Sequence, residues 1–368
     1  MTAQAPINPP PPQRYGVLDA YRYIAALGVT LYHFERHFQP YMAHPTDVLE
    51  RMNLCVDFFF VLSGFVLMHT YGGRIGSLAA FGAFIRKRLA RVYPLHFVMT
   101  LVFIVAALAV MRLGIAVRNP STLNLAAAPA HLLLVHAWGF DLPPALNFPS
   151  WSISAEFFVY LCFPLFAFLV LRLGALRALA LAYALGLAMT FARDALGMRD
   201  WTDATYDFGN LRAVPSFLAG MALQMLVSQR KFRVSFGVAH AGAAFVAALM
   251  LFQAPNLLIV ALFPLVIGLI ASAEQTGAPS LLARGVWLKL GDASYGLYLI
   301  HTAVVLVCLV LMRKFGFFAP GQMILVALLG SAAATGLAML SFRYFENPAR
   351  KYFGRSTPAP AQTAARPC

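Results

Sequence analysis

One apolar stretch of the chain contains two side chains that lipid disfavours. The stretch RYIAALGVTLYHF begins with Arg22 and carries His33 near its end. On a helix, a separation of eleven residues returns to nearly the same face, so these side chains point the same way but lie roughly 16 Å apart along the axis. An ionisable group at the centre of a membrane helix costs about 2.5–3.5 kcal/mol and usually marks a site or a water-filled path. A hydrogen bond between helices is the simpler explanation for a lone histidine.

Two carboxylates are expected at the same depth as His33. Asp57 lies near the start of VDFFFVLSGFVL, and Glu156 lies early in SWSISAEFFVYLCFP. We expect both stretches to begin at the outer membrane surface, near which the helix of His33 ends. A neutral imidazole oriented by a carboxylate is a standard general base. We therefore predict that His33, Asp57 and Glu156 form one acid–base group, in direct contact or through one water. Capping of the two helix starts is the alternative role for the carboxylates.

A pair of arginines is expected at the opposite, inner surface. Arg88 and Arg91 are spaced three apart in IRKRLARVYPLHF, which leads into an apolar stretch. Planar guanidinium groups bind phosphate oxygens through paired hydrogen bonds, so the pattern indicates a phosphate site. A basic run beside a membrane span also serves as a topology anchor, and this simpler role stays open.

The composition places these residues in a helical membrane protein. Of 368 residues, 60% are hydrophobic and 11% are charged, with a mean hydropathy of +0.71. Soluble domains carry about 25% charged residues. Apolar runs long enough to cross a bilayer recur along the chain. We predict apolar segments near residues 18–38, 53–70, 93–111, 123–138, 152–171, 176–191, 212–228, 235–252, 257–273, 293–312 and 322–342.

The segment 123–138, LNLAAAPAHLLLVHAW, decides the predicted topology. If it does not span, most loop lysines and arginines fall on the side of the N-terminus, whereas every later loop reverses if it does. Cytoplasmic loops are the ones enriched in Lys and Arg. We therefore predict an all-α polytopic membrane protein of about ten transmembrane helices, with 123–138 as a re-entrant or interfacial helix and both termini cytoplasmic.

The ends of the chain differ in composition from the apolar region. We predict a flexible proline-rich arm at 1–16, an integral-membrane domain at 17–352 and a disordered tail at 353–368. The net charge of +14 is attributed to cytoplasmic loops and not to nucleic-acid binding. The four cysteines show no pairing or metal spacing, so we expect no metal site. We also expect no permanently bound cofactor.

Seven short motifs, taken in order, resemble the acyltransferase-3 family of bacterial integral-membrane acyltransferases. They extend from about Leu18 to Lys351 and read LDAYRYIAALGVTLYHF, VDFFFVLSGFVL, IRKRLARVYPLHF, SWSISAEFFVYLCFP, NLRAVPSFLAGM, GDASYGLYLIHTAV and SFRYFENPARK. The resemblance implies a catalytic group of His33, Asp57 and Glu156. It implies substrate binding by Arg22, Arg88, Arg91, Arg212, Tyr298 and His301. Ser216 departs from many relatives, which have an acidic or aromatic residue there, and this bears on acceptor choice.

The activity implied by the resemblance is O-acyl transfer. The donor is cytoplasmic acyl-coenzyme A, with acetyl as the expected acyl group, and the acceptor is a hydroxyl of a glycan or glycolipid at the cell surface. The resemblance places the enzyme in the bacterial inner membrane, with polysaccharide-synthesis machinery as a partner. Two alternatives stay open: a glycolipid transporter or flippase, and an acyltransferase that acts on a small molecule or lipid. Internal inverted repeats would favour a transporter, and the two halves show no clear repeat.

Overall fold

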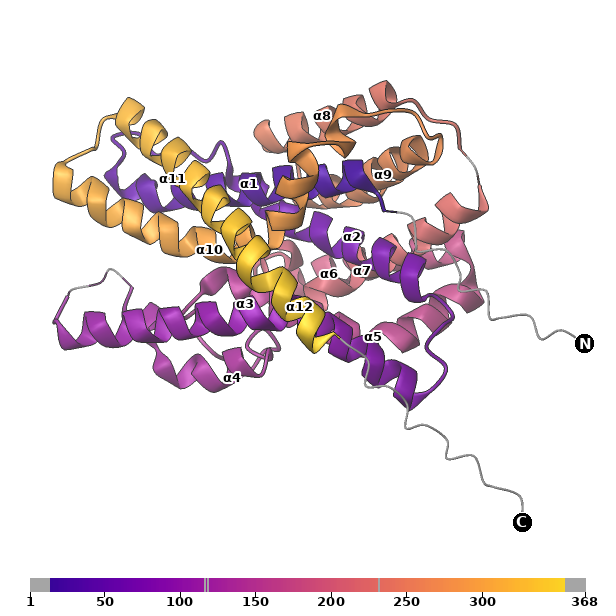
Figure 1. Cartoon of the computed structure of the whole chain (residues 1–368), viewed down its shortest axis with the longest axis horizontal. Coiled ribbons are helices and arrows are strands. Elements are labelled where there is room, and N and C mark those ends of the chain that lie inside the picture. Colours follow the sequence, from indigo (N-terminus) through magenta and orange to yellow (C-terminus); the bar gives the residue numbers. More distant parts are fainter. Residues whose placement is uncertain (1–13, 116, 118, 231, 355–368) are drawn as a thin grey trace, which may run out of the picture.

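The computed structural model describes residues 14–115, 117, 119–230 and 232–354, and every regular element in these ranges is helical (Figure 1). The predicted arm up to residue 13 and the tail from residue 355 lie outside the described residues. The helices are α1 Gly16–Phe38, α2 Cys55–Tyr71, α3 Leu78–Arg112, α4 Ala128–Leu132, α5 Trp151–Leu173, α6 Ala175–Ala195, α7 Gly209–Gln229, α8 Phe236–Leu251, α9 Asn256–Gln275, α10 Val286–Phe315, α11 Pro320–Ser341 and α12 Asn347–Phe353.

Each predicted apolar segment except 123–138 overlaps one long helix or, at 235–252, the shorter helix α8. Eight ranges of the described chain are long and apolar enough to cross a bilayer. The helix α8, with 16 residues, is shorter. The helix α1 falls outside the eight because Asp19, Arg22 and His33 lower its hydropathy. The fold is therefore the predicted all-α, multi-pass membrane bundle.

The segment 123–138 does not cross the bundle. It consists of short 3₁₀ turns, the five-residue helix α4 and a loop. Pro129 stands in the first turn of α4, and Leu134 adopts a positive φ of 59° two residues after the helix ends. A helix this short cannot span about 30 Å of hydrocarbon. The loop that follows is tucked into the protein, where Leu134, Ala137 and Asn147 are almost fully buried.

The helix α3 starts much earlier than the predicted span 93–111. Ser77 caps its first turn by accepting a hydrogen bond from the N–H of Ala80, and the helix then continues for 35 residues. At 1.5 Å per residue it is about 50 Å long, which exceeds the bilayer core. Arg88 and Arg91 consequently lie within a continuous helix and not in a loop before it.

The tightest helix packing joins α2 and α7 in the middle of the bundle, with α10 and α11 on one side and α8 and α9 on the other (Figure 1). Two glycines permit it. A Cβ atom on Gly220 would overlap the carbonyl oxygen of Val61, and one on Gly64 would overlap that of Phe217. Small residues let membrane helices approach closely enough for their backbones to touch. This contact holds α2 in place, and α2 carries Asp57 and Ser63.

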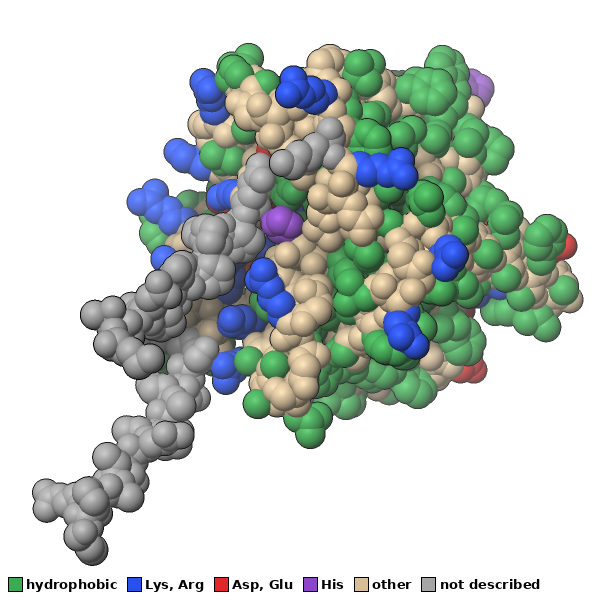
Figure 2. All heavy atoms as spheres, turned by 90° about the vertical axis from the view of Figure 1, so that its right-hand side faces the viewer, with side chains coloured by type: hydrophobic (Ala, Val, Ile, Leu, Met, Phe, Trp, Pro, Cys, Tyr) green, Lys and Arg blue, Asp and Glu red, His purple; other side chains and the backbone are tan. Residues whose placement is uncertain are grey.

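Both ends of the described chain lie at one end of the bundle, and Lys and Arg side chains are spread over the face that Figure 2 shows there. We call it the basic end, because it carries Arg88, Arg91 and Arg350. The positive-inside rule predicts that it faces the cytoplasm.

The α2–α7 contact makes Gly220 a sensitive position. We expect Gly220→Ala to destabilise the folded protein by about 1–3 kcal/mol or more, because the added methyl has no room between two backbones. Thermal unfolding of the purified variant in detergent measures this. Gly336→Ala in α11 is the control, since its Cβ would meet nothing within 4 Å. Equal melting temperatures for the two variants would contradict the packing argument.

Candidate active site

Two adjoining cavities open at the basic end. The first, which we call the basic cleft, has a volume of about 550 Å³ and is lined by Lys87, Arg88, Arg91, Arg350, Lys351 and Gly354. The second, which we call the inner cavity, has a volume of about 510 Å³ and reaches between α1, α2, α5 and α10. Arg88, Arg91 and Arg350 line both. The two cavities therefore form one path that begins among cations and continues into the bundle.

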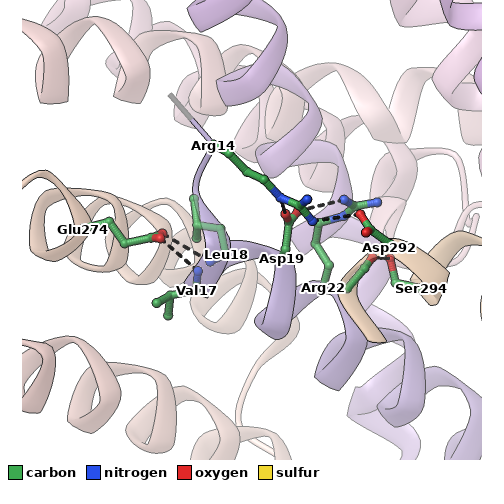
Figure 3. Close-up of polar contacts among 9 residues, drawn as sticks. Arg14, Val17, Leu18, Asp19, Arg22, Glu274, Asp292 and Ser294 are labelled. Atoms are coloured by element: carbon green, nitrogen blue, oxygen red, sulfur yellow. Dashed lines mark hydrogen bonds and ion pairs between the residues drawn. The ribbon is translucent and has the colours of Figure 1, made fainter. Parts of the chain in front are cut away.

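Carboxylates fix the start of α1 beside the inner cavity (Figure 3). Asp19 accepts hydrogen bonds from Arg14 at 2.7 Å and from Arg22 at 3.1 Å, and Arg14 also reaches Asp292 of α10 at 2.8 Å. Partial burial lowers the pKa of Arg14, but the two carboxylates raise it overall above its ordinary value. Arg22 lines the cavity, although its guanidinium already has a carboxylate partner within its own helix.

A third carboxylate, which comes from α9, orients the first turn of α1. Glu274 accepts hydrogen bonds from the backbone N–H groups of Val17 and Leu18, at 2.9 and 3.3 Å. The first N–H groups of a helix have no partner within it, and a carboxylate is the favoured acceptor there. This contact and the Arg14 bridge set the depth of α1, and hence of Arg22 and His33.

Arg88 and Arg91 lie on one face of α3, as their spacing predicts. Arg88 donates a hydrogen bond to the hydroxyl of Tyr71 at 3.3 Å, and its guanidinium lies 5.4 Å from the centre of that ring. Within the described residues neither arginine forms an ion pair with a carboxylate. Their positive charge is therefore available to an anion in the cavities.

Glu156 lies in the inner cavity with these arginines and not beside His33. It accepts hydrogen bonds from Ser63 at 2.9 Å and from Tyr160 at 2.5 Å. The expected position at the outer membrane surface is wrong. The loop before α5 is tucked into the protein, so Trp151, the first residue of the helix, is already buried. Glu156 therefore lies deeper than a helix start at the membrane surface would place it.

Asp57 forms an ion pair with Arg212 inside the bundle. The Oδ2 and Oδ1 atoms accept hydrogen bonds from Nη2 at 2.6 Å and Nε at 3.3 Å, and the two side chains are 0% and 2% exposed. The guanidinium also lies 5.0 Å from the centre of the Trp151 ring. Neither residue lines the cavities. Of the acid–base group predicted to form in direct contact or through one water, the direct Asp57–His33 contact is not formed, because both carboxylate oxygens accept hydrogen bonds from Arg212.

The His33 side chain contacts a second histidine, His301, which lies on α10. His33 Nδ1 lies 2.8 Å from the carbonyl oxygen of Val29 and 3.2 Å from His301 Nε2. His301 Nδ1 in turn faces the carbonyl oxygen of Leu297 at 3.2 Å. A nitrogen that faces a carbonyl oxygen must carry the proton, so both rings are assigned as Nδ1–H tautomers. His33 Nε2 then keeps its lone pair, as a base requires.

Tyr298 lines the inner cavity and also packs against His301. Its ring centre lies 5.9 Å from that of His301. Its hydroxyl accepts a hydrogen bond from Ser152 at 2.8 Å and donates one to the carbonyl oxygen of Pro149 at 2.9 Å. The resemblance thus identified two residues, Tyr298 and His301, that the structure places together with His33.

Sequence reasoning missed the contribution of the C-terminal helix to the site. Arg350 and Lys351 of α12 complete the basic cleft, and Glu346 lines the inner cavity. They belong to the motif SFRYFENPARK, which was used for family resemblance and for topology alone. The cationic residues directly after the last span could have indicated a role in the site. The packing of α12 against α3 could not have been predicted from the sequence.

Comparison with known proteins identifies the family. Residues 15–343 match the acyltransferase-3 family, described as an acyltransferase domain. The chain belongs to the acyltransferase-3 family. This membrane acyltransferase is 27% identical to the acyltransferase MdmB of Streptomyces mycarofaciens over 384 aligned positions, which cover 95% of each chain. It is 31% identical to protein 2 in the picA locus of Rhizobium radiobacter over 163 positions, covering 40% of this chain and 80% of that one. No solved structure is a significant match.

The Asp57–Arg212 pair predicts a specific pattern of stability. Asp57→Asn should destabilise the acyltransferase by about 3–5 kcal/mol, because it leaves the Arg212 charge buried without a counter-charge. The double variant Asp57→Asn with Arg212→Gln should melt at a higher temperature than the single one. Thermal unfolding of the purified proteins provides the comparison. If the single variant is as stable as the wild type, the ion pair does not hold α2 and α7 together.

Proposed function

We propose that this enzyme transfers an acyl group, acetyl in the simplest case, from acyl-coenzyme A to a hydroxyl of a cell-surface or exported polysaccharide. One observation carries the proposal. A cationic cleft shares Arg88, Arg91 and Arg350 with an inner cavity that is lined by Tyr298, and the Tyr298 ring packs against His301 of the His33–His301 pair. The donor enters from the basic end and the acceptor approaches His33 from the other side of the bundle.

The chemistry of the donor fits the two cavities. Coenzyme A carries several phosphate groups at one end and a thioester at the end of a long flexible arm. Guanidinium forks are suited to the phosphates, and Arg88, Arg91 and Arg350 present them at the entrance. The inner cavity then takes the arm towards Tyr298. Acyl-coenzyme A acts as a co-substrate that arrives and leaves, and no permanently bound cofactor is required.

His33 acts as the general base in this mechanism. Its Nε2 lone pair removes the proton of the acceptor hydroxyl while the oxygen attacks the thioester carbonyl. The carbon–sulfur bond breaks, and the thiolate of coenzyme A leaves and takes up a proton. His301 is a positioning residue, because its Nε2 accepts from His33 Nδ1 and so fixes the reactive tautomer. A placed general base contributes typically about 10²–10⁴ in rate.

The family and the relatives support an enzyme over a transporter. The similarity to a protein named as an acyltransferase extends over 95% of both chains. The polysaccharide acceptor, the bacterial inner membrane and an association with polysaccharide-synthesis machinery follow from the family resemblance. An acyltransferase that acts on a small molecule or lipid would use the same cavities. Conversion of labelled acetyl-coenzyme A into acylated glycan by the purified protein tests the activity, and glycan analysis of a deletion strain identifies the acceptor.

The donor site is tested through the two arginines of α3. Arg88→Ala and Arg91→Ala should each raise the KM for acyl-coenzyme A at least tenfold with little change in acceptor KM, because each removes a phosphate contact. Lysine at either position should rescue only in part, since it keeps the charge but loses the fork. Arg86→Ala is the matched control, because Arg86 lies on the same helix and lines neither cavity. Equal changes in donor and acceptor KM would argue against a donor site.

The base is tested by removing the imidazole. His33→Ala should lower kcat by about 10²–10⁴ while the protein stays folded and donor KM changes little. His240→Ala controls for the loss of a helix-to-helix contact. His240 lies on α8, and its Nδ1 atom shares a hydrogen bond of 2.8 Å with the hydroxyl of Tyr21 on α1. A His33→Ala enzyme that keeps most of its turnover would show that His33 only packs the helices.

A further inference from the structure

Three side chains from different helices meet at the wall of the inner cavity. Phe59 of α2 and Tyr298 of α10 are in edge-to-face contact, with ring centres 6.1 Å apart, and Ser152 of α5 donates to the tyrosine hydroxyl. All three line the cavity. Along α2, the residues from Cys55 to Phe60 are buried except for Phe59, which is partly exposed and lines the cavity together with Val56 and Phe60. The rings of Phe59 and Tyr298 thus meet at the cavity wall, and Tyr298 also contacts His301.

The two histidines lie outside both cavities, and Tyr298 connects them to the inner one. His33 and His301 line neither cavity, and the ring centre of Tyr298, which does line the inner cavity, lies 5.9 Å from that of His301. A thioester in the inner cavity that approaches His301 therefore contacts Tyr298, and Phe59 lies against the Tyr298 ring. The part of the acyl group beyond the thioester carbon must then fit against these two rings.

The two walls differ in how firmly they are held. The hydroxyl of Tyr298 has two partners, Ser152 and the carbonyl oxygen of Pro149, which fix the ring in place. Phe59 has only apolar contacts, including an edge-to-face contact with Phe58 at 6.0 Å. Tyr298 is accordingly the fixed wall, and Phe59 is the side chain whose size decides how much space is left.

We propose that Phe59, set against the fixed ring of Tyr298, determines the length of the acyl group that this enzyme accepts and restricts it to short chains. The inference rests on the proposed function, because it assumes a thioester donor in the inner cavity. It names an apolar specificity residue that is not among the nine candidate site residues, all of which have ionisable side chains. The selection of the acyl group depends on the van der Waals volume of the Phe59 side chain and not on a charge or a hydrogen bond.

The test compares donors of different chain length on one protein. Purified full-length enzyme in detergent is titrated calorimetrically with coenzyme A, acetyl-coenzyme A and octanoyl-coenzyme A. We expect wild type to bind acetyl-coenzyme A more tightly than octanoyl-coenzyme A. Phe59→Ala should shift the octanoyl-to-acetyl affinity ratio at least tenfold towards octanoyl, because each methylene accepted by an apolar pocket is worth about tenfold or more.

A neighbouring phenylalanine supplies the matched control. Phe58→Ala makes the same truncation one residue away, but Phe58 packs against Phe263 and does not line the cavity. Its octanoyl-to-acetyl ratio should equal that of wild type. Phe59→Leu, a milder change, gives the same direction of shift should the alanine variant fail to fold.

The outcomes separate this inference from the proposed function. If every protein binds coenzyme A and its thioesters, and Phe59→Ala keeps the wild-type ratio, the length restriction is overturned and the donor site stands. If coenzyme A itself does not bind wild type, the donor assignment is overturned and the restriction falls with it. A shift of equal size in Phe58→Ala also overturns the proposal, because general loosening of α2 would then explain it.

Discussion

A charge buried between the helices needs either a partner or contact with a cavity, and this requirement governs how the bundle packs. Lipid cannot solvate a carboxylate or a guanidinium, so an unpaired one would cost several kcal/mol. Asp57 and Arg212 meet this requirement within the core, at an N–O distance of 2.6 Å. Asp19, Arg14 and Asp292 meet it at the basic end. The pairings decide which helices are neighbours, because a partner must come from a helix that can place its side chain at the same depth.

Hydropathy and periodicity were sufficient to predict the helices, because lipid requires long apolar segments whatever their neighbours are. The stretch 123–138 was correctly separated from the spans by the charge distribution of the loops. The start of α3 was missed, since its first turns are cationic and no apolar signal marks them. The depth of α5 was missed for another reason. Local sequence does not reveal that the preceding loop folds inward and takes Trp151 and Glu156 with it.

The candidate site shows the same division between local and tertiary information. Residue type and spacing placed Arg88 and Arg91 on one face, and family resemblance indicated Tyr298 and His301. Contacts between side chains of different helices could not be predicted from the sequence. The sequence predicts a carboxylate partner for the His33 imidazole. In the structure His33 contacts a second imidazole, and Asp57 contacts an arginine. Which acid meets which base depends on helix rotation and register, and close contacts such as that of Gly220 with Val61 set these in the folded protein.

The basic cleft brings cations of α3 and α12 together without a carboxylate among its lining residues. Like charges repel, by about 1 kcal/mol at 4 Å in water and more where protein displaces the solvent. Without a bound anion, repulsion between the cations therefore disfavours the packing of α12 against α3. A polyanion that binds in the cleft neutralises these charges and so stabilises the contact between the two helices. Added salt screens the same repulsion, so a high ionic strength and a bound donor each reduce the repulsion between α3 and α12.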